Sequence, residues 1–274
     1  MKLTKYHALG NDYIVLDDPP RVASLTEYQI RRVCHRNFGI GSDGILARVV
    51  PNADEDFELI IFNPDGSRAE KSGNGLRIFS RYLFDEGLVA SDPFTVRTEG
   101  GRVVCHVKRP DEIVVDMGQV SFHSRDIPVT GPDREVLQEP ITIGGEDYEY
   151  SAATIGNPHC VVFREQVSES EARTVGPALE TDSRFPRRTN VQFAQVIDRG
   201  HLRIEIWERG AGYTLASGSS SSAVARRLGW IDAEVFVEMP GGVLRIEMDE
   251  DYSIRMTGPA TKIATCEVDE DMWS

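Results

Sequence analysis

Apolar and polar residues alternate along most of this chain, and turns rich in glycine, asparagine and proline interrupt the alternation at short intervals. A period of two residues is typical of strands that bury one face, whereas a period near 3.6 is typical of helices. The alternation predicts two strands within residues 1–17 and further strands over residues 57–62, 94–98, 102–107, 113–117, 141–151, 160–163, 190–197, 201–207, 234–238, 243–248 and 254–256. Helical spacing predicts helices over residues 27–34, 76–83, 169–179 and 223–228.

One arrangement of these elements occurs twice. Ser72, in the turn KSGNG, has its counterpart 145 residues later in Ser217, in the turn ASGSS. In both copies the serine follows an extended apolar segment and precedes a run with helical spacing. Gly10–Val15 also matches Gly156–Val161 at nearly the same offset. A repeat of this length over most of a 274-residue chain indicates duplication of a whole domain.

We therefore expect two similar domains. The first comprises residues 1–117, and the tail, residues 263–274, is expected to return to it. The second comprises residues 118–262, with the polar, proline-containing residues 119–138 as the junction.

The formal charge is −14 at pH 7, which argues against nucleic acid or an anionic membrane as a partner, because both require clustered lysine and arginine. No apolar run approaches the roughly 18 residues needed to span a membrane, and residues 1–7 lack the apolar core of a signal peptide. A soluble, cytoplasmic protein is expected. If its ligand is an anion, basic groups must be concentrated locally, and Arg209 is a candidate.

The cysteines indicate neither a disulfide framework nor a zinc site, because Cys34, Cys105, Cys160 and Cys266 are widely separated and form no Cys-x-x-Cys pair. The six histidines are equally scattered. The single Gly-x-Gly at 39–41 is a weak nucleotide signal without a Rossmann unit to support it. We expect free buried thiols, no metal and no cofactor.

The two serine turns are candidate anion sites. A small-residue turn that enters a helix presents free backbone N–H groups and the positive end of the helix dipole to a carboxylate or phosphate. The candidate donors are the backbone N–H groups of Gly73, Asn74, Gly218 and Ser219. The simpler alternative is that each turn is only an N-cap and a flexible connection.

Six separated segments occur in order over nearly the whole chain: Gly10–Asp12, Phe62–Ser67, Gly73–Arg77, Gly156–His159, Thr189–Val191 and Glu208–Gly212. Together they resemble the diaminopimelate epimerases, which have the cofactor-independent amino-acid racemase fold. The resemblance implies an α+β protein of two pseudo-symmetric domains, each a curled mixed β-sheet around a central helix, with the substrate in the cleft between them.

Members of that family invert the α-carbon of an amino acid without pyridoxal phosphate. One cysteine takes the α-proton from one face, and a second delivers a proton to the other. In this sequence the two cysteine positions are occupied by Ser72 and Ser217. A thiol titrates near ~8.5 and an alcohol close to water at roughly 15.7, so forming the base costs on the order of 10 kcal/mol more.

An adjacent general base could recover part of that cost. His159 is the candidate, because the resemblance places it at the substrate and a neutral imidazole accepts a proton near pH 7. The alternative is that His159 only packs or forms a hydrogen bond with the ligand. The serines themselves are either deliberate replacements or natural divergence; Ser219, Ser220 and Tyr213 also depart from the family, which favours divergence.

The resemblance further assigns polar side chains to the distal end of the substrate. An ammonium group prefers Glu208 and amide oxygens, whereas a carboxylate prefers Arg209. These two residues could instead form a surface ion pair. The other matched positions are Asn11, Asn63, Asn157 and Asn190.

The resemblance therefore implies an isomerase, a cofactor-independent epimerase or racemase of the diaminopimelate epimerase type. Its expected substrate is a zwitterionic amino acid with a polar or charged far end, and its expected place is in lysine and amino-acid biosynthesis. One alternative is an isomerase or lyase of the same fold with one-sided proton transfer. Another is a catalytically silent amino-acid-binding protein. The sequence leaves a homodimer open.

Overall fold

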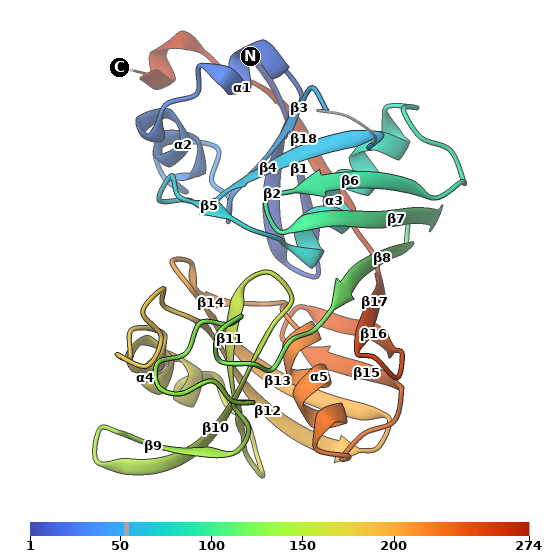
Figure 1. Ribbon diagram of the computed structural model, residues 1–274. Coiled ribbons are helices and arrows are strands. Elements are labelled where there is room, and N and C mark those ends of the chain that lie inside the picture. Colours follow the sequence, from blue (N-terminus) through green and yellow to red (C-terminus); the bar gives the residue numbers. More distant parts are fainter. Residues whose placement is uncertain (52–54, 274) are drawn as a thin grey trace. The chain divides into compact units, whose positions relative to one another are not determined.

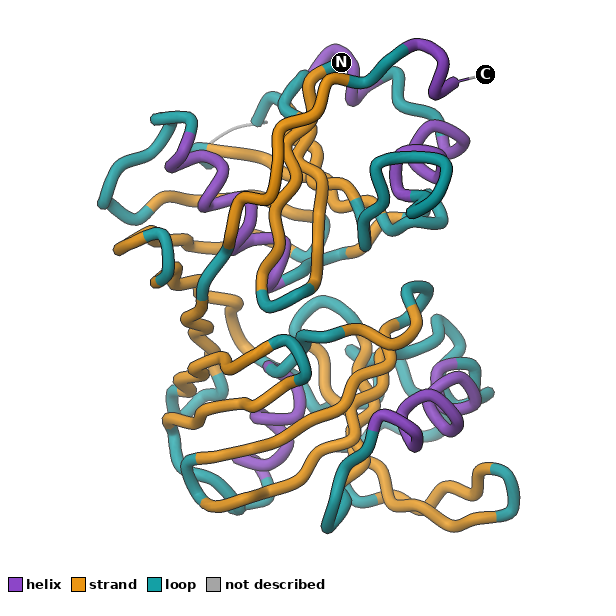
Figure 2. The backbone as a smooth tube through the Cα atoms, turned by 180° about the vertical axis from the view of Figure 1, so that it is seen from behind, coloured by secondary structure: helices purple, strands orange, loops and turns teal. Residues whose placement is uncertain are grey.

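The computed structural model describes residues 1–51 and 55–273. Its strands and helices gather into two units, one of residues 1–116 and 257–274 and the other of residues 117–256. The second unit thus ends at residue 256, whereas the sequence pattern placed its end at 262. In both units most of the ordered backbone is in strands, shown in orange in Figure 2.

The first unit, in blue to green with its carboxyl-terminal segment in red in Figure 1, contains nine strands and four helical segments within the described residues. The strands are β1 (Lys2–Ala8), β2 (Asn11–Leu16), β3 (Ile45–Val49), β4 (Phe57–Phe62), β5 (Arg68–Ala69), β6 (Phe94–Thr98), β7 (Gly101–Arg109), β8 (Glu112–Gln119) and β18 (Thr261–Glu267). The helices are α1 (Pro19–Ala23), α2 (Glu27–Cys34), α3 (Gly73–Asp85) and the short 3-10 helix η1 (Glu270–Trp273).

The second unit contains nine strands and two helices within the described residues. The strands are β9 (Glu139–Ile143), β10 (Glu146–Thr154), β11 (Pro158–Phe163), β12 (Asn190–Asp198), β13 (His201–Glu208), β14 (Gly212–Thr214), β15 (Glu234–Met239), β16 (Gly242–Met248) and β17 (Ser253–Gly258). The helices are α4 (Glu169–Glu180) and α5 (Ser219–Arg227).

Strand pairing follows the same scheme in both units. In the first, β1–β2 is antiparallel, β2–β3 parallel, β3–β4 antiparallel, β4–β6 parallel and β6–β7 antiparallel. In the second, β10–β11, β11–β12, β12–β13, β13–β15 and β15–β16 repeat that sequence of directions. The register repeats as well, since Ile14 pairs with Ile45 and Cys160 with Val191, 146 residues later in each case. The two units are therefore pseudo-symmetric copies.

In each unit one more strand pairs with the first strand of the scheme, but the two units take this strand from different parts of the chain. In the second unit β9, which directly precedes β10 in the chain, pairs with it antiparallel. In the first unit the equivalent place beside β1 is taken by β18, the last strand of the chain. The tail therefore returns to the first unit as a strand of its sheet.

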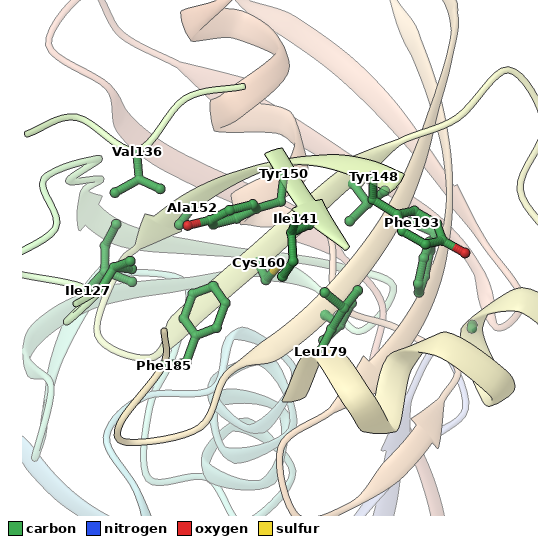
Figure 3. Packing of buried hydrophobic residues seen from close by; sticks show 14 residues of the cluster. Ile127, Val136, Ile141, Tyr148, Tyr150, Ala152, Cys160, Leu179, Phe185 and Phe193 are labelled. Atoms are coloured by element: carbon green, nitrogen blue, oxygen red, sulfur yellow. The ribbon is translucent and has the colours of Figure 1, made fainter. Parts of the chain in front are cut away.

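Each unit has one helix that the strands surround (Figure 1). Helix α3 packs against β1, β2, β7 and β18, and α5 packs against β10, β11, β12 and β16. The opposite face of each sheet packs against another helix. In the second unit this core includes Leu179 of α4 and Phe185, which lie close to Cys160 and Tyr150 in Figure 3. The Tyr150 and Phe185 rings meet edge to face, with centroids 5.8 Å apart.

Several elements differ from those predicted. The strand predicted over 141–151 is a hairpin, because Gly144 and Gly145 adopt positive φ angles of 62° and 89° and turn the chain between β9 and β10. Helices α3 and α5 begin three and four residues earlier than predicted, since their first turns consist of small and polar residues. The short elements α1, β3, β5, β14 and η1 and the seven-residue strand β18 were not predicted.

Two expectations about composition can be compared with the structure. The four cysteines are free; three are buried and Cys266 is half-buried. Among the described residues no helix has the length and apolarity that crossing a bilayer requires.

Candidate functional site

In the first unit, β2 and the start of α3 bring the predicted residues Asn11, Ser72, Gly73 and Asn74 together. The strand alternates, so Ile14 and Leu16 face the core formed with α2, and Asn11 lies on the opposite face. Asn74 Nδ2 donates a hydrogen bond of 2.9 Å to Asn11 Oδ1, which joins strand and helix directly.

Ser72 is the N-cap of α3. Its backbone is extended, with φ −141° and ψ 116°, and its Oγ accepts a 3.0 Å hydrogen bond from the backbone N–H of Gly75. Gly75 permits this close approach, because a Cβ there would lie 3.2 Å from Ser72 Oγ and 2.9 Å from Leu46 Cδ2. The hydroxyl of Ser72 thus has the capping role that the simpler alternative proposed, and it remains half-buried.

A chain of side-chain hydrogen bonds starts at Arg77 and ends at a carboxylate. Arg77 Nη2 donates to Asn74 Oδ1 at 2.7 Å, and Asn11 Nδ2 donates to Asp43 Oδ2 at 2.9 Å. Because guanidinium can only donate and carboxylate can only accept, the orientation of both amides is fixed. The side chains of Asn11 and Asn74 are therefore held in one orientation next to the Ser72 turn.

The guanidinium of Arg77 is wholly buried, with 0 % of the residue exposed. Its Nε and Nη1 have no hydrogen-bond partner among the described residues. Burial lowers the pKa of Arg77 to about 9, which still leaves the group charged at neutral pH. A cation buried in the early turns of α3 adds to the positive potential of the helix N-terminus.

The carboxylate end of the network is a charged cluster. Asp12 pairs with Lys5 and Arg36 at 2.8 Å each, and Asp43 pairs with Arg36 at 2.6 Å. Burial acts to raise the pKa of Asp12, but hydrogen bonds from Arg36 and Lys5 outweigh it and hold that pKa below its usual range. Burial and the neighbouring charge of Asp12 raise the pKa of Asp43.

Asn63 lies in a separate turn after β4. Its Nδ2 donates to Ser67 Oγ at 2.9 Å, and its backbone N–H donates to the Ser67 carbonyl at 2.8 Å. The structure therefore shows Asn63 stabilising its own turn, with its side chain half-buried.

In the second unit, the beginnings of β11 and β12 bring His159 and Asn190 together. The two residues are register partners in the parallel pair. Asn190 Nδ2 donates to the Pro158 carbonyl at 3.1 Å, and its Oδ1 accepts from the backbone N–H of Arg209 at 2.9 Å. Asn190 thereby ties the Gly156–His159 turn to the turn that carries Arg209.

His159 is 6 % exposed, and its Nδ1 has no hydrogen-bond partner among the described residues. Burial and the nearby charge of Arg209 lower the pKa of His159 to about 3. The imidazole is consequently neutral at pH 7 and able to donate one hydrogen bond and accept another.

The remaining predicted residues of this turn region are half-buried. Asn157 lies before β11, and Glu208 ends β13, where its carbonyl accepts from the N–H of Ala211 at 3.2 Å. Arg209 Nη1 donates to the Arg187 carbonyl at 3.3 Å. Arg209 is thus held beside His159 from both its backbone and its side chain.

The Ser217 turn is built differently from the Ser72 turn. The N-cap of α5 is Gly218, which lacks a side chain to cap the helix, and Ser217 lies one residue earlier. Gln192, on β12, takes over this function. Its Oε1 accepts from the N–H of Ser221 at 2.8 Å, and its Nε2 donates to the Ser217 carbonyl and, at 3.1 Å, to Ser217 Oγ.

Four consecutive buried serines form the first turn of α5. Ser221 Oγ and Ser222 Oγ both donate to the Gly218 carbonyl, at 3.2 and 2.9 Å. Ser219 begins the helix and is 7 % exposed, so its backbone and that of Gly218 lie at the helix N-terminus.

Sequence reasoning assigned no role to Gln192, Arg77 or Asp43. A signal for Gln192 was available, since Asn190 and Gln192 alternate with the core residues Val191 and Phe193, which puts two polar side chains on one face of a buried strand. Arg77 lies in the matched segment Gly73–Arg77, but the sequence predicted no role for its side chain. The contact between Asp43 and Asn11 could not be predicted, because the two residues are 32 positions apart and meet only through the folding of the chain between them.

Comparison with known proteins gave consistent results. A family model described as diaminopimelate epimerase matches residues 3–123 and 151–263. The chain is 53% identical over 278 residues to "Diaminopimelate epimerase 2" of a Nostoc species, covering 100% of this chain and 98% of that protein. It is 41% identical over 272 residues to the diaminopimelate epimerase of Moorella thermoacetica, covering 96% and 97%.

Among solved structures, a probable proline racemase from Agrobacterium radiobacter K84 superimposes with a TM-score of 0.72 at 15% identity, covering 98% of this chain and 93% of that one. At that identity the likeness concerns the fold. It confirms the two-domain α+β architecture that the sequence segments implied.

Proposed function

Because this chain belongs to the diaminopimelate epimerase family of isomerases, we propose that it epimerises diaminopimelate by proton transfer at the α-carbon without a cofactor. The observation that supports this most strongly is the 53% identity, over the full chain, to a protein named as such an epimerase. The full-length match to named epimerases favours this activity over one-sided proton transfer and over silent binding of an amino acid.

The helix N-termini supply the anion-binding part of the proposal. Backbone N–H groups of Gly73 and Asn74 in one unit, and of Gly218 and Ser219 in the other, lie in first turns or caps, where helices leave donors free. Such donors bind a carboxylate and stabilise the enolate-like charge that develops as the α-proton leaves.

Ser72 and Ser217 are the proposed proton-transfer groups, one taking the α-proton and the other delivering a proton to the opposite face. Each Oγ already accepts an N–H hydrogen bond, from Gly75 or from Gln192. Those donors would stabilise an alkoxide, but they recover only part of the roughly 7 pKa units that separate an alcohol from a thiol.

His159 is better suited to binding than to acting as the base. With a pKa of about 3, its imidazole has little affinity for a proton at neutral pH. Its unpartnered Nδ1 can instead form a hydrogen bond with the substrate. Glu208 and Arg209 would then hold the ammonium and the carboxylate of the distal end, with the amides of Asn11, Asn63, Asn157 and Asn190 around it.

Incubation with LL-diaminopimelate in deuterium oxide tests the proposal. Inversion with incorporation of one solvent deuteron at the α-carbon is the expected result, and Ser72→Ala and Ser217→Ala should each abolish it. Exchange without inversion would support one-sided chemistry, and binding without exchange would support a silent binding protein.

Restoring the thiols provides a second test. Ser72→Cys combined with Ser217→Cys should raise kcat/KM for LL-diaminopimelate by at least about 100-fold, because a thiol near pKa 8.5 is far easier to deprotonate than an alcohol. No gain in a folded double variant would show that the substrate-binding groups, and not only the proton-transfer pair, have diverged.

The proposal also includes a role in lysine biosynthesis, a cytoplasmic location and a homodimeric state. Cell fractionation and light scattering of the purified protein test the last two.

A further inference from the structure

Gln192 is the side chain through which β12 reaches the Ser217 turn. The residue is 0 % exposed, and its register partner on β11 is Val161. It lies two residues after Asn190, so the two amides share the face of the sheet that packs against α5.

The orientation of the Gln192 amide is fixed by the backbone. The N–H of Ser221 requires an acceptor, which must be Oε1, and the carbonyl of Ser217 requires a donor, which must be Nε2. Because Nε2 has no lone pair, its contact with Ser217 Oγ at 3.1 Å can only be a donated hydrogen bond. The amide therefore presents an N–H group to the hydroxyl oxygen.

This contact determines where the hydroxyl proton of Ser217 points. An oxygen that accepts a hydrogen bond from one neighbour directs its own O–H away from that neighbour. The backbone N–H of Ser217 is itself held, since it donates to Met239 Sδ at 3.2 Å. Ser217 is thus fixed at its backbone and through its side-chain oxygen.

The first unit achieves the equivalent result by other means. The position that matches Gln192 in register is Leu46, an apolar residue, and Ser72 caps α3 with its own Oγ. In the second unit Gln192 caps the helix, and the serine precedes the cap. The two serines are therefore chemically inequivalent within otherwise repeated units.

We propose that Gln192 is a positioning residue of the second half-site, which directs the proton of the group at position 217 outward and stabilises negative charge on its side-chain atom when that proton has left. The catalytic role of Gln192 rests on the proposed function, because it concerns one of the two proposed proton-transfer groups. The local interaction can nevertheless be measured without turnover.

A thiol placed at position 217 is the reporter. In Ser217→Cys combined with Cys266→Ser, the introduced thiol is the accessible one, because Cys34, Cys105 and Cys160 are buried. The pH dependence of its alkylation by iodoacetamide gives its pKa. Adding Gln192→Leu, the residue of the matched position, should raise that pKa by about 1 unit, because the thiolate then loses the hydrogen bond that Nε2 donates.

Two controls keep the result specific. In Ser72→Cys with Cys266→Ser, the same Gln192→Leu change should leave the thiol pKa unaltered. Gln192→Met, which preserves the length of the side chain, should reproduce the shift, so that a folding defect of one variant does not decide the outcome. An unchanged pKa in both folded Gln192 variants overturns the proposal.

Measurements of kcat and KM separate the role of Gln192 from the proposed function. In the Ser72→Cys and Ser217→Cys double variant, Gln192→Leu should lower kcat about 10-fold or more with a small change in KM, and it should move the alkaline limb of the pH profile. If the double variant has no epimerase activity, the proposed function fails, while the alkylation measurement still decides the role of Gln192.

Discussion

At the scale of single residues, Arg77 is the least conventional feature, since it has no salt-bridge partner among the described residues although it is wholly buried. Removing a charge from water costs several kcal/mol unless it is compensated. Among the described residues, the compensation for Arg77 is one hydrogen bond to the side-chain oxygen Oδ1 of Asn74. A buried cation with so little compensation, in the early turns of α3, favours an anion bound at the helix N-terminus.

Replacing Arg77 therefore separates stability from function. We expect Arg77→Met to change the free energy of unfolding by less than about 1.5 kcal/mol, because an apolar side chain of similar length replaces a poorly solvated charge. The same change should raise the thiol pKa of Ser72→Cys. Urea denaturation and iodoacetamide alkylation measure the two effects. Arg81→Met, which removes a half-buried ion pair with Asp85 on the same helix, is the control and should leave the thiol pKa unaltered.

His159 gives a prediction about pH. Its pKa in the folded protein is about 3, below the ordinary value of 6.5, so between these values the unfolded chain binds a proton that the folded chain does not. Its contribution to stability is complete above pH 6.5 and is lost as the pH falls toward 3, by up to about 1.4 kcal/mol per pH unit. His159→Gln should flatten the decline in stability between pH 6 and 4, as measured by urea denaturation. An unchanged slope would contradict the burial of a neutral imidazole.

At the scale of elements, the beginnings of α3 and α5 show how two copies of one plan diverge. Ser72 caps α3 itself, whereas Gly218 and Gln192 divide that function in α5. We expect Ser72→Ala to cost about 1 kcal/mol of stability, the usual value of an N-cap. Ser217→Ala should cost less, because the N–H of Ser221 keeps its acceptor. Paired denaturation curves of the two variants test this, and equal losses would contradict it.

Local pattern was sufficient to predict most of the long elements. Alternation identified β4, β6, β13 and most other strands, and α2 has the predicted bounds. It missed the local turn at Gly144 and Gly145, which divides an apparently continuous strand. It also failed where a strand depends on its pairing partner, since β5 forms by pairing with β4 and β18 by pairing with β1. The candidate site residues were predicted from the recognised segments, whereas the contacts of Gln192 required knowledge of which strand faces α5.

At the scale of the whole molecule, the last strand belongs to the sheet of the first unit. β18 pairs with β1 over the length of both strands, and Arg81 Nη1 donates to the Ala260 carbonyl at 2.9 Å just before it. β9 serves the second unit from within its own sequence. The first unit thus depends on residues from the far end of the chain to complete its sheet.

Truncation after residue 259 should consequently affect the units unequally. We expect the first unit to lose most of its stability, because β1 becomes an exposed edge and α3 loses a contact. The two tryptophans that remain, Trp207 and Trp230, both lie in the second unit, so fluorescence should report a transition close to that of the full chain. Far-UV circular dichroism should show a separate, earlier loss of structure. A single coincident transition would contradict this.

The pairing of β18 with β1 also sets an order of events on the ribosome. Domains generally fold as units while the chain is synthesised. Here the amino-terminal sheet must wait for residues translated more than 250 positions after its first strand, whereas the carboxyl-terminal sheet receives every one of its paired strands earlier. The half that is made first is completed last, and until then its open edge is available to chaperones.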